Sequence, residues 1–376
     1  KTVQHGFASG KKNPNTGVPV CGDEVLSEAE LEKNRENMWQ AFLSRELIDD
    51  YYRERTADLS KVTVPLLSAA NWGGQGLHTR GTFEGFVNSR TKDKWLEVHG
   101  GSHWAPFYTD YGRGLQLDFF DHFLKGKDNG WDKQSRVLLN VRSPGERFVL
   151  RSENEWPLAR TRWTPFYLDP ETMQLVRDEP RSTKALTYEP MGDGLTFSTP
   201  PLKGELEITG PSALKLRISS ATTDADLFIV LRVFDPAGKE VLFQGALDPK
   251  TPVGQGWLRA SHRKVDKARS LPYRPWHTHD EKQPLKPGEP VDLDIEIWPT
   301  CIVIPAGYRL ALSIRGRDYE HDDAAATLSN MKNPMKGCGP FTHDDPTDRP
   351  PAIFGGKVTV HFEQQPYVLL PVIPMN

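Results

Sequence analysis

The sequence has little of what marks several protein classes. Only three cysteines occur in 376 residues, and they are widely spaced and odd in number: Cys21, Cys301 and Cys338. This pattern argues against a disulfide framework and against a cysteine-based zinc site. No apolar run reaches the roughly 18 residues that a membrane span needs, and no Asn-X-Ser/Thr sequon is present. We therefore expect no membrane partner and take a cytoplasmic location as the default.

The chain also lacks an excess of charge of either sign. Its 47 Lys and Arg residues nearly balance its 50 Asp and Glu residues, so the composition does not indicate nucleic acid or an anionic membrane as a partner. What it does contain is 10 Trp, 17 Phe and 31 Pro, a composition that suits a β-rich protein with long loops. The length suffices for two or three domains with a sizeable core.

The N-terminal region shows no strand pattern. The chain begins at Lys1 without Met and without a signal-like segment, as if it started within a domain. Residues 1–22 are rich in Gly, Asn and Pro and are predicted to be loop. In residues 27–55, Ser27 and Glu30 form a capping-box pattern, which predicts that one or two helices follow.

Residues 61–126 alternate between strand and helix patterns. The continuous apolar run of residues 61–72 and the run of residues 94–100 predict strands buried on both faces. Residues 80–90 and 111–126 have helical patterns, and the second ends in Lys-Gly. This order predicts a βαβα unit with parallel strands. Chemistry in open parallel sheets gathers at the carboxyl ends of the strands, which here carry the segments NWGGQGLH and HGGSHW.

After about residue 130 the helical periodicity disappears. Segments such as RVLLNVR, LKLRISS, DLFIVLRVFDP and YRLALSIRG alternate or cluster in β-branched and aromatic residues, between Gly, Pro and Asp turns. This spacing predicts an antiparallel sandwich or jelly roll of roughly 240 residues. Its aromatic residues are expected in the core rather than on a sugar-stacking surface.

His103 follows the second predicted parallel strand and is a candidate general base. The alternative interpretation is a loop histidine that only hydrogen-bonds backbone, and position alone does not decide between them. No G-x-S-x-G nucleophile elbow occurs in the chain. Ser102 is adjacent to His103, and neighbours on one loop rarely reach each other well, while Ser68 lies inside a strand. The sequence therefore offers no nucleophile for His103.

The acid that would orient this histidine is also missing from its expected place. The segment after the first parallel strand holds Asn71 and Gln75 but no Asp or Glu. Glu84, one turn into the next helix, and Asp110, just past the histidine, are the possible acids. For both, solvation at the surface is the competing interpretation.

Potential metal ligands cluster in three short segments, HTHDE at residues 277–281 and HDD at residues 321–323 and 343–345. Their spacing matches neither a calcium-binding loop nor the HExxH motif. We expect no metal and no cofactor.

Six segments resemble one family. They are KVTVPLLSAANWGGQGLHTRGTFEGF, KWLEVHGGSHW, FFDHFLKGKDNGW, GWLRASHRKVDKARSLPYRPWHTH, EIWPTCIVIPAGYRLALSIRG and HDDPTDRP. These segments are similar to the CocE/NonD hydrolases, which include cocaine esterase, α-amino-acid ester hydrolases and X-Pro dipeptidyl peptidases. The resemblance covers essentially the whole chain, and the WLRASHRK block is quite specific.

The resemblance implies an α/β-hydrolase core with an inserted helical cap, followed by an all-β jelly-roll sandwich of galactose-binding-like form. Residues 1–58 are then the end of the cap region, residues 59–130 the C-terminal part of the core with its parallel strands, and residues 131–376 the jelly roll. The resemblance also implies that His103 is the catalytic histidine. The family's nucleophilic serine lies upstream of the cap, so the resemblance places it upstream of this chain.

The family's acid usually sits in a Gly-Trp-X-Asp stretch after the preceding core strand. The matching residues here are 71–74, and Gly74 occupies the position of the acid. The resemblance therefore leaves open which carboxylate completes the triad.

Two functions of different classes follow from these observations. The first is a serine hydrolase that cleaves ester or amide bonds of a small-molecule substrate, with the missing N-terminal hydrolase half as a partner and a homo-oligomeric state as the family often shows. Trp257 and Trp276 are then the aromatic residues expected near substrate. The alternative is a catalytically incomplete fragment that acts as a structural, ligand-binding or carbohydrate-binding β-sandwich module.

Overall fold

The computed structural model describes residues 4–326, 334–339 and 342–374. The chain divides into two compact units, Lys1–Arg55 and Thr56–Asn376. The first unit contains three short helices: α1 (Glu28–Lys33), α2 (Met38–Leu43) and α3 (Asp50–Arg55). The predicted capping box is confirmed, because the Ser27 hydroxyl accepts from the backbone N–H of Glu30 while the Glu30 carboxylate accepts from the backbone N–H of Ser27. A third helix forms where one or two were expected, since the Asn37 side chain caps a new start at α2.

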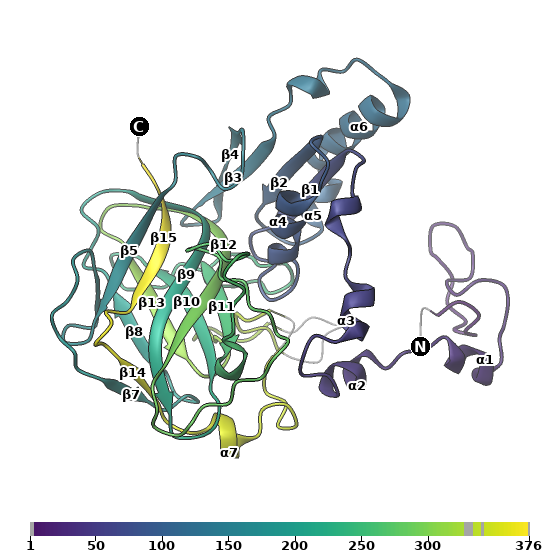
Figure 1. Ribbon diagram of the computed structural model, residues 1–376. Coiled ribbons are helices and arrows are strands. Elements are labelled where there is room, and N and C mark those ends of the chain that lie inside the picture. Colours follow the sequence, from purple (N-terminus) through teal and green to yellow (C-terminus); the bar gives the residue numbers. More distant parts are fainter. Residues whose placement is uncertain (1–3, 327–333, 340–341, 375–376) are drawn as a thin grey trace. The chain divides into compact units, whose positions relative to one another are not determined.

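The second unit begins with the predicted βαβα arrangement, which is confirmed (Figure 1). Its four-stranded sheet has the order β1-β2-β3-β4, and both the β1–β2 and the β2–β3 pairings are parallel. The strands are β1 (Leu66–Asn71), β2 (Lys94–His99), β3 (Val137–Ser143) and β4 (Arg147–Glu153). The helices are α4 (Thr79–Asn88), α5 (Ala105–Tyr108) and α6 (Asp110–Lys125), with one-turn 3-10 segments at Leu59–Lys61 and Trp131–Lys133. Gly126, in the left-handed conformation, ends α6.

The strands β3 and β4 differ from the sequence expectation, which placed everything beyond residue 130 in the sandwich. β3 pairs in parallel with β2, and β4 pairs in antiparallel with β3. β3 is a nearly continuous buried run and β4 is largely exposed, so periodicity alone could not tell which sheet they extend. The strand β1 is less buried than predicted, since it lies at the edge of this sheet among the described residues.

The rest of the second unit is β-rich. An eleven-stranded sheet follows the path β11-β10-β13-β8-β6-β5-β15-β9-β14-β7, with β12 paired to β9. The bounds are β5 (Arg162–Asp169), β6 (Gln174–Val176), β7 (Leu186–Tyr188), β8 (Leu195–Ser198), β9 (Leu206–Ser220), β10 (Asp226–Phe234), β11 (Gly254–Arg259), β12 (Val291–Ile304), β13 (Arg309–Arg315), β14 (Val358–His361) and β15 (Tyr367–Ile373). A 3-10 turn at Ala260–His262 and the short helix α7 (Pro351–Phe354) complete the elements. Nearly all pairings are antiparallel, as predicted.

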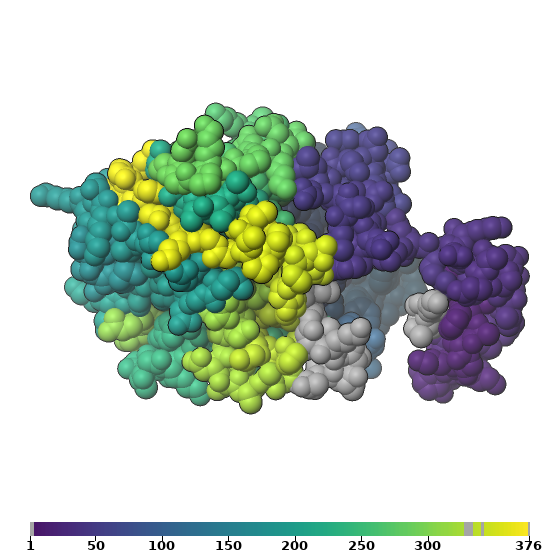
Figure 2. Space-filling view, turned by 90° about the horizontal axis from the view of Figure 1, so that it is seen from below, coloured from purple at the N-terminus to yellow at the C-terminus, as the bar shows by residue number. Residues whose placement is uncertain are grey.

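One hydrophobic core holds the β-rich domain together. It draws buried side chains from strands along the whole path, from Leu258 on β11 through Leu370 on β15 to Tyr188 on β7. The sheet therefore wraps around a common interior. The C-terminal strand β15 pairs with both β5 and β9. In Figure 2 the C-terminal segment, in yellow, accordingly lies against teal residues from much earlier in the chain.

A second core joins the four-stranded sheet to the β-rich domain. Trp72, Phe83 and Leu139 pack in the same buried cluster as Cys301 and Ile373. Apolar burial across this contact makes the two sheets one compact unit.

The fully buried Arg142 of β3 crosses the same contact. Its guanidinium donates to Cys301 O at 2.8 Å, Val253 O at 2.9 Å and Thr300 Oγ1 at 2.7 Å, all in the β-rich domain. Burial lowers the pKa of Arg142 to about 10. None of the helices in the described ranges has the length and apolar character that a membrane crossing needs.

Candidate active site

The carboxyl ends of β1 and β2 are fastened together by Asn71. Asn71 is paired with His99 in the parallel register. Its side-chain amide donates to Gly101 O at 2.8 Å, and its Oδ1 accepts from Gly73 N at 2.9 Å. The backbone N–H of Trp72 donates to His99 O. One buried asparagine thus fixes both loops that the sequence identified as the place for chemistry.

The β-rich domain supports these two loops from the other side. The backbone N–H of His103 donates to Ala246 O at 2.9 Å, and the N–H of Ala246 donates to Gly73 O at 3.0 Å. The approach is so close that a Cβ on Gly73 would lie 2.3 Å from the Cα of Gly245. Glycine is therefore required at residue 73, and the two sheets build this edge jointly.

The His103 ring is half-buried at this edge. Its Nδ1 is buried and has no hydrogen-bond partner, and its centroid lies 5.2 Å from that of the exposed His78 ring. Burial lowers the pKa of His103, and the positive charges of His78 and His99 lower it further. A histidine kept neutral in this way is competent to accept a proton at neutral pH.

The structure brings neither predicted acid to His103. Glu84 accepts from Arg274 of the β-rich domain at 2.9 Å and from Asn88 at 2.8 Å. Asp110 is exposed at the start of α6 and pairs with Arg113. Within residues 4–326, 334–339 and 342–374, no hydrogen bond joins the His103 ring to a carboxylate or a hydroxyl. The role of either residue as the acid stays a prediction.

Gly74, at the family's acid position, is tightly enclosed. Its carbonyl accepts from the backbone N–H groups of Leu77, His78 and Thr79 at the start of α4. A Cβ at residue 74 would lie 2.9 Å from Thr79 Oγ1. A side chain here would require Thr79 to move.

The structure does not support either of the two serines, Ser68 and Ser102, as a nucleophile for His103. The Ser68 hydroxyl lies within β1 and donates to Thr82 O at 3.2 Å. Ser102 precedes His103 on the same loop and is half-buried. The structure assigns Ser68 a packing role.

Three residues that the sequence reasoning missed meet near the end of β2: Glu97 and His99 on that strand and Tyr111 on α6. Glu97 is 3% exposed, and its Oε2 lies 2.8 Å from Nδ1 of His99. The Tyr111 hydroxyl hydrogen-bonds to the same carboxylate, and burial and the Glu97 charge raise the pKa of Tyr111. The signal was a charged residue in the middle of an otherwise apolar run, WLEVH, where a strand buried on both faces has no solvated side.

The segments considered for metal binding hold other partners. Asp280 and Glu281 both pair with Lys264, and His279 Nδ1 lies 3.1 Å from His262 Nδ1. No group of three or more His, Cys, Asp or Glu side chains suited to a metal ion occurs in the part of the chain that the structure describes.

The other two segments are also engaged or lack a set of ligands. His321 is buried with both ring nitrogens unpartnered, and Asp323 pairs with Lys250. His343 Nδ1 lies 2.9 Å from Asp318 Oδ1. Each imidazole of the HDD segments thus stands alone or against a single carboxylate.

The two tryptophans named for the substrate site have different surroundings. Trp257 packs over the loop that follows β1, since a Cβ on Gly76 would lie 3.6 Å from its Cη2. Trp257 also stands edge-on to Trp298, with 5.2 Å between ring centroids. Trp276 instead packs against Arg269, whose guanidinium lies 3.6 Å from the ring. Only Trp257 lies next to the candidate site loops.

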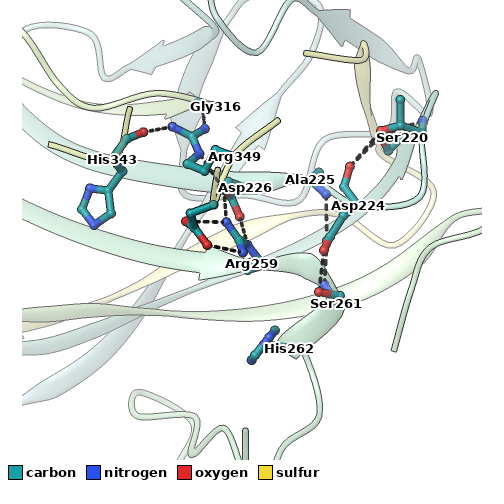
Figure 3. A network of polar contacts seen from close by, with 12 residues as sticks. Ser220, Asp224, Ala225, Asp226, Arg259, Ser261, His262, Gly316, His343 and Arg349 are labelled. Carbon is teal, nitrogen blue, oxygen red and sulfur yellow. Dashed lines mark hydrogen bonds and ion pairs between the residues drawn. The ribbon is translucent and has the colours of Figure 1, made fainter. Parts of the chain in front are cut away.

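A dense polar network elsewhere in the β-rich domain is structural (Figure 3). Asp226 accepts from Arg259 at 2.9 and 3.0 Å and from Arg349 at 2.8 Å. Asp224 accepts from the backbone N–H and the hydroxyl of Ser261. Both carboxylates are buried and fully paired, so this network fixes the loops around β11 rather than offering a reactive group.

The parallel sheet, its edge loops and the β-rich domain identify the chain as a relative of the α/β hydrolases with a β-rich C-terminal domain. The family model of the X-Pro dipeptidyl-peptidase C-terminal non-catalytic domain matches residues 129–332. The chain belongs to this family, as the CocE/NonD-like C-terminal region that the sequence resemblance indicated.

Solved structures and curated relatives agree with this assignment. The crystal structure of a CocE/NonD family hydrolase from Staphylococcus aureus superposes with a TM-score of 0.82 at 28% identity, covering 92% of this chain and 61% of that one. A Mycobacterium bovis protein provisionally named a serine esterase is 24% identical over 316 residues, covering 70% of this chain and 47% of the relative. A provisionally named Xaa-Pro dipeptidyl-peptidase from Streptomyces avermitilis is 25% identical over 286 residues, covering 63% and 40%. The chain thus spans about half the length, or less, of these curated relatives.

Proposed function

We propose that this chain is the C-terminal part of a serine hydrolase of the CocE/NonD type that cleaves ester or amide bonds, with its nucleophilic serine in a segment upstream of these residues. The observation that carries the proposal is the position of His103. It is a neutral, half-buried imidazole on the loop at the carboxyl end of a parallel strand, where α/β enzymes place their chemistry. The relatives named esterase and dipeptidyl-peptidase support the reaction class.

The proposed reaction needs only groups of known chemistry. The serine oxygen attacks the substrate carbonyl while its proton passes to Nε2 of His103. Backbone N–H groups hold the oxyanion, and His103 then gives the same proton to the leaving alcohol or amine. Water hydrolyses the acyl-enzyme by the same route, which regenerates the serine.

Exposed apolar surface on the helix α6, which accompanies the four-stranded sheet, supports the missing half as partner. Leu117, Phe120 and Leu124 share one face of α6 and are 57%, 50% and 76% exposed. Parallel sheets are normally covered on both faces, and a continuous apolar patch marks an interaction surface. The edge strand β1 likewise offers unpaired backbone groups to a further strand.

The finer description of the β-rich domain is part of the same proposal. We infer a jelly roll of galactose-binding-like form that helps to wall the acyl site, with Trp257 beside the loop after β1. A cytoplasmic location is supported by three buried cysteines that form no disulfide with one another, since disulfides are common in oxidising compartments.

A fluorophosphonate probe tests the proposal directly. The purified material is treated with the probe, and the intact mass of every polypeptide is recorded before and after. Labelling of a longer polypeptide that contains these residues, or of a second chain that copurifies with them, is expected, and His103→Gln should abolish it. A single unlabelled species with the mass of this chain would contradict the proposal and leave the alternative of a structural or ligand-binding module.

A further inference from the structure

One buried guanidinium of the β-rich domain makes no hydrogen bond to any residue that the structure describes. Arg315, the last residue of β13, is 7% exposed, and its Nε is buried without a partner. Within the described ranges its one ion pair is with Asp193, whose Oδ1 lies 3.6 Å from Nη2 of Arg315. That distance is too long for a hydrogen bond. Because arginine keeps its charge and its five N–H donors, burying it in this way is costly.

Comparable arginines of the second unit are well paired. The Arg142 guanidinium donates to three acceptors, and Arg232 binds both oxygens of Glu240 at 2.9 and 2.7 Å. Arg349 donates to a buried carboxylate and to two backbone carbonyl groups. Buried donors in native proteins are nearly always paired, so Arg315 departs from the pattern that this fold follows for its neighbours.

A second arginine faces the same place. Nη2 of Arg317 lies 3.8 Å from the same Oδ1 of Asp193. Its one hydrogen bond within the described ranges runs from Nε to Gly192 O at 3.2 Å. Two guanidinium groups therefore converge on one carboxylate oxygen, and neither lies within hydrogen-bonding distance of it. Burial lowers the pKa of Arg315, and the nearby charge of Arg317 lowers it further.

The backbone between the two arginines is fixed on both sides. The N–H of Gly316 donates to Pro190 O at 2.9 Å, and its carbonyl accepts from the Arg349 guanidinium (Figure 3). A Cβ on Gly316 would lie 2.2 Å from Cβ of Pro190, so the turn that carries Asp193 packs directly against the end of β13. Guanidinium groups held on so fixed a backbone bind an anion at a reduced cost in ordering.

Asp193 is a weak counter-ion for this pair. Its side chain is 98% exposed, so solvent screens its charge and the side chain can turn away. The other carboxylate near Arg317, that of Glu320 at 3.7 Å, is shared with Lys336 at 3.5 Å. Guanidinium groups match the oxygens of carboxylates and phosphates through paired N–H···O bonds. Two adjacent cations favour the doubly charged phosphate over a singly charged carboxylate.

We propose that Arg315 and Arg317 form a binding site for a phosphoryl group, which displaces the Asp193 carboxylate and accepts hydrogen bonds from both guanidinium groups. Only Nε of Arg315 is enclosed, so its terminal nitrogens remain accessible to such a ligand. Free phosphate and a phosphomonoester present the same tetrahedral oxyanion, with about two negative charges above pH 7. The site belongs to the β-rich domain and does not depend on the proposed hydrolase activity.

Titration of the full chain with inorganic phosphate is the first test. The chain is labelled with ¹⁵N, and phosphate replaces chloride at constant ionic strength and pH 7.5. The Nε–H signals of Arg315 and Arg317 should move and saturate with a Kd of about 1 mM or tighter. The imidazole ¹⁵N shifts of His103, on the loop after β2, are recorded as a control and should stay unchanged. Arginine signals that do not saturate, or that follow chloride equally well, would overturn the proposal.

Two further anions test the chemistry of the ligand. Acetate should bind at least about 10-fold more weakly than phosphate, because it brings one charge instead of two. Acetate that binds as tightly as phosphate would overturn the assignment to a phosphoryl group. Phenyl phosphate distinguishes the two sources of that group: tighter binding than that of inorganic phosphate identifies a phosphomonoester as the ligand, and weaker binding identifies free phosphate.

Variants of the two arginines test the residues. Arg315→Gln and Arg317→Gln should each weaken phosphate binding by at least about 10-fold, since each removes one guanidinium. Arg309→Gln is the matched control, because Arg309 is exposed on the same strand and donates to Thr199 O, and it should bind as the unmodified chain does. Arg317 is more exposed than Arg315, so Arg317→Gln keeps the test decisive if Arg315→Gln fails to fold. Undiminished binding in Arg317→Gln would overturn the proposal.

Removal of the counter-ion tests the displacement. Asp193→Ala should tighten phosphate binding by about 3- to 10-fold, because the ligand no longer competes with a carboxylate for both guanidinium groups. Asp178→Ala, at another exposed aspartate of the β-rich domain, is the control for the general loss of a negative charge and should change the affinity much less. Unchanged or weaker binding in Asp193→Ala would mean that Asp193 does not compete for the two arginines, and would overturn the proposal.

Discussion

Two buried carboxylates of the second unit, Asp226 in the β-rich domain and Glu97 in the four-stranded sheet, differ in how completely they are paired. In the β-rich domain, Asp226 receives three N–H groups from Arg259 and Arg349. At the end of β2, by contrast, Glu97 has no guanidinium or ammonium partner in the described structure, and two neighbouring ring nitrogens are unpaired. Complete pairing stabilises a loop arrangement, while incomplete pairing is a cost that persists where the groups are needed for chemistry.

Pairing alone does not separate structural from functional polar groups, since His321 of the β-rich domain is also buried with both ring nitrogens unpartnered. Histidine occurs in both regions, and so does buried carboxylate. What distinguishes the edge of β1 and β2 is its place in the fold, since the unpaired Nδ1 of His103 lies on the loop at the carboxyl end of a parallel strand. If the paired network and the contact between the sheets are structural, substitutions there should lower the free energy of unfolding.

Removing the charge of Asp226 should damage folding severely. In Asp226→Asn the amide keeps one acceptor and turns N–H groups toward Arg259 and Arg349, so the buried Arg349 loses its counter-charge and Arg259 keeps only Asp348. We expect unfolding in urea to show a loss of about 3–5 kcal/mol. The imidazole tautomers of His103 should remain as in the unmodified chain, because the network is structural.

A surface pair provides the control for that variant. Asp292 also pairs with an arginine, Arg217, but its side chain is 63% exposed. Asp292→Asn should cost less than about 1 kcal/mol. Equal losses of unfolding free energy in the two variants would show that burial of the Asp226 network adds no stability beyond that of a surface pair.

The contact between the two regions should be nearly as sensitive. In Gly73→Ala the new Cβ would meet backbone atoms, 2.3 Å from Gly245 Cα and 2.9 Å from Gln244 O. Since the backbone must shift, we expect a loss of about 1–3 kcal/mol and an altered His103 spectrum, because Gly73 O holds the Ala246 segment that in turn binds His103. Thermal unfolding and the imidazole shifts measure the two effects.

Gly85→Ala is the matched substitution within α4. No atom lies within 4 Å of the position of its new Cβ, so alanine should stabilise the helix by about 0.5–1 kcal/mol. A similar gain for Gly73→Ala would rule out the close approach of the two sheets as the reason for glycine there.

The sequence predicted the part of this architecture that local patterns encode. The βαβα unit, the capping box at Ser27 and the position of His103 after a buried strand all follow from periodicity and short-range chemistry. The sheet to which β3 belongs could not be predicted in this way, because strand pairing depends on tertiary contacts such as the Arg142 hydrogen bonds to Cys301 and Val253. Glu97 was missed because alternation rules treat a charged residue in a strand as solvent-facing, whereas a parallel strand in the middle of a sheet has no such face.

The histidines of the β-rich domain allow a final and smaller test of the contrast. Burial lowers the pKa of His279 to about 4, with further lowering by the charges of His262, His277 and Arg80, while Asp280 opposes it. Unfolded histidine takes up its proton near pH 6.5, so between about pH 6.5 and 4 protons bind the unfolded chain in preference, and stability falls as the pH is lowered.

His279→Asn should reduce that pH dependence. Asparagine suits the left-handed backbone at this residue, where φ is +49°, so the fold should tolerate the change. The difference in unfolding free energy between pH 7 and pH 4.5 should shrink by about 1 kcal/mol once solvent screening is allowed for. Urea titrations of both chains at several pH values measure it, with His5→Asn, at an exposed histidine, as the control. An undiminished pH dependence in His279→Asn would mean that the buried imidazoles of this domain do not resist protonation, and that neutrality enforced by burial is specific to the edge where His103 lies.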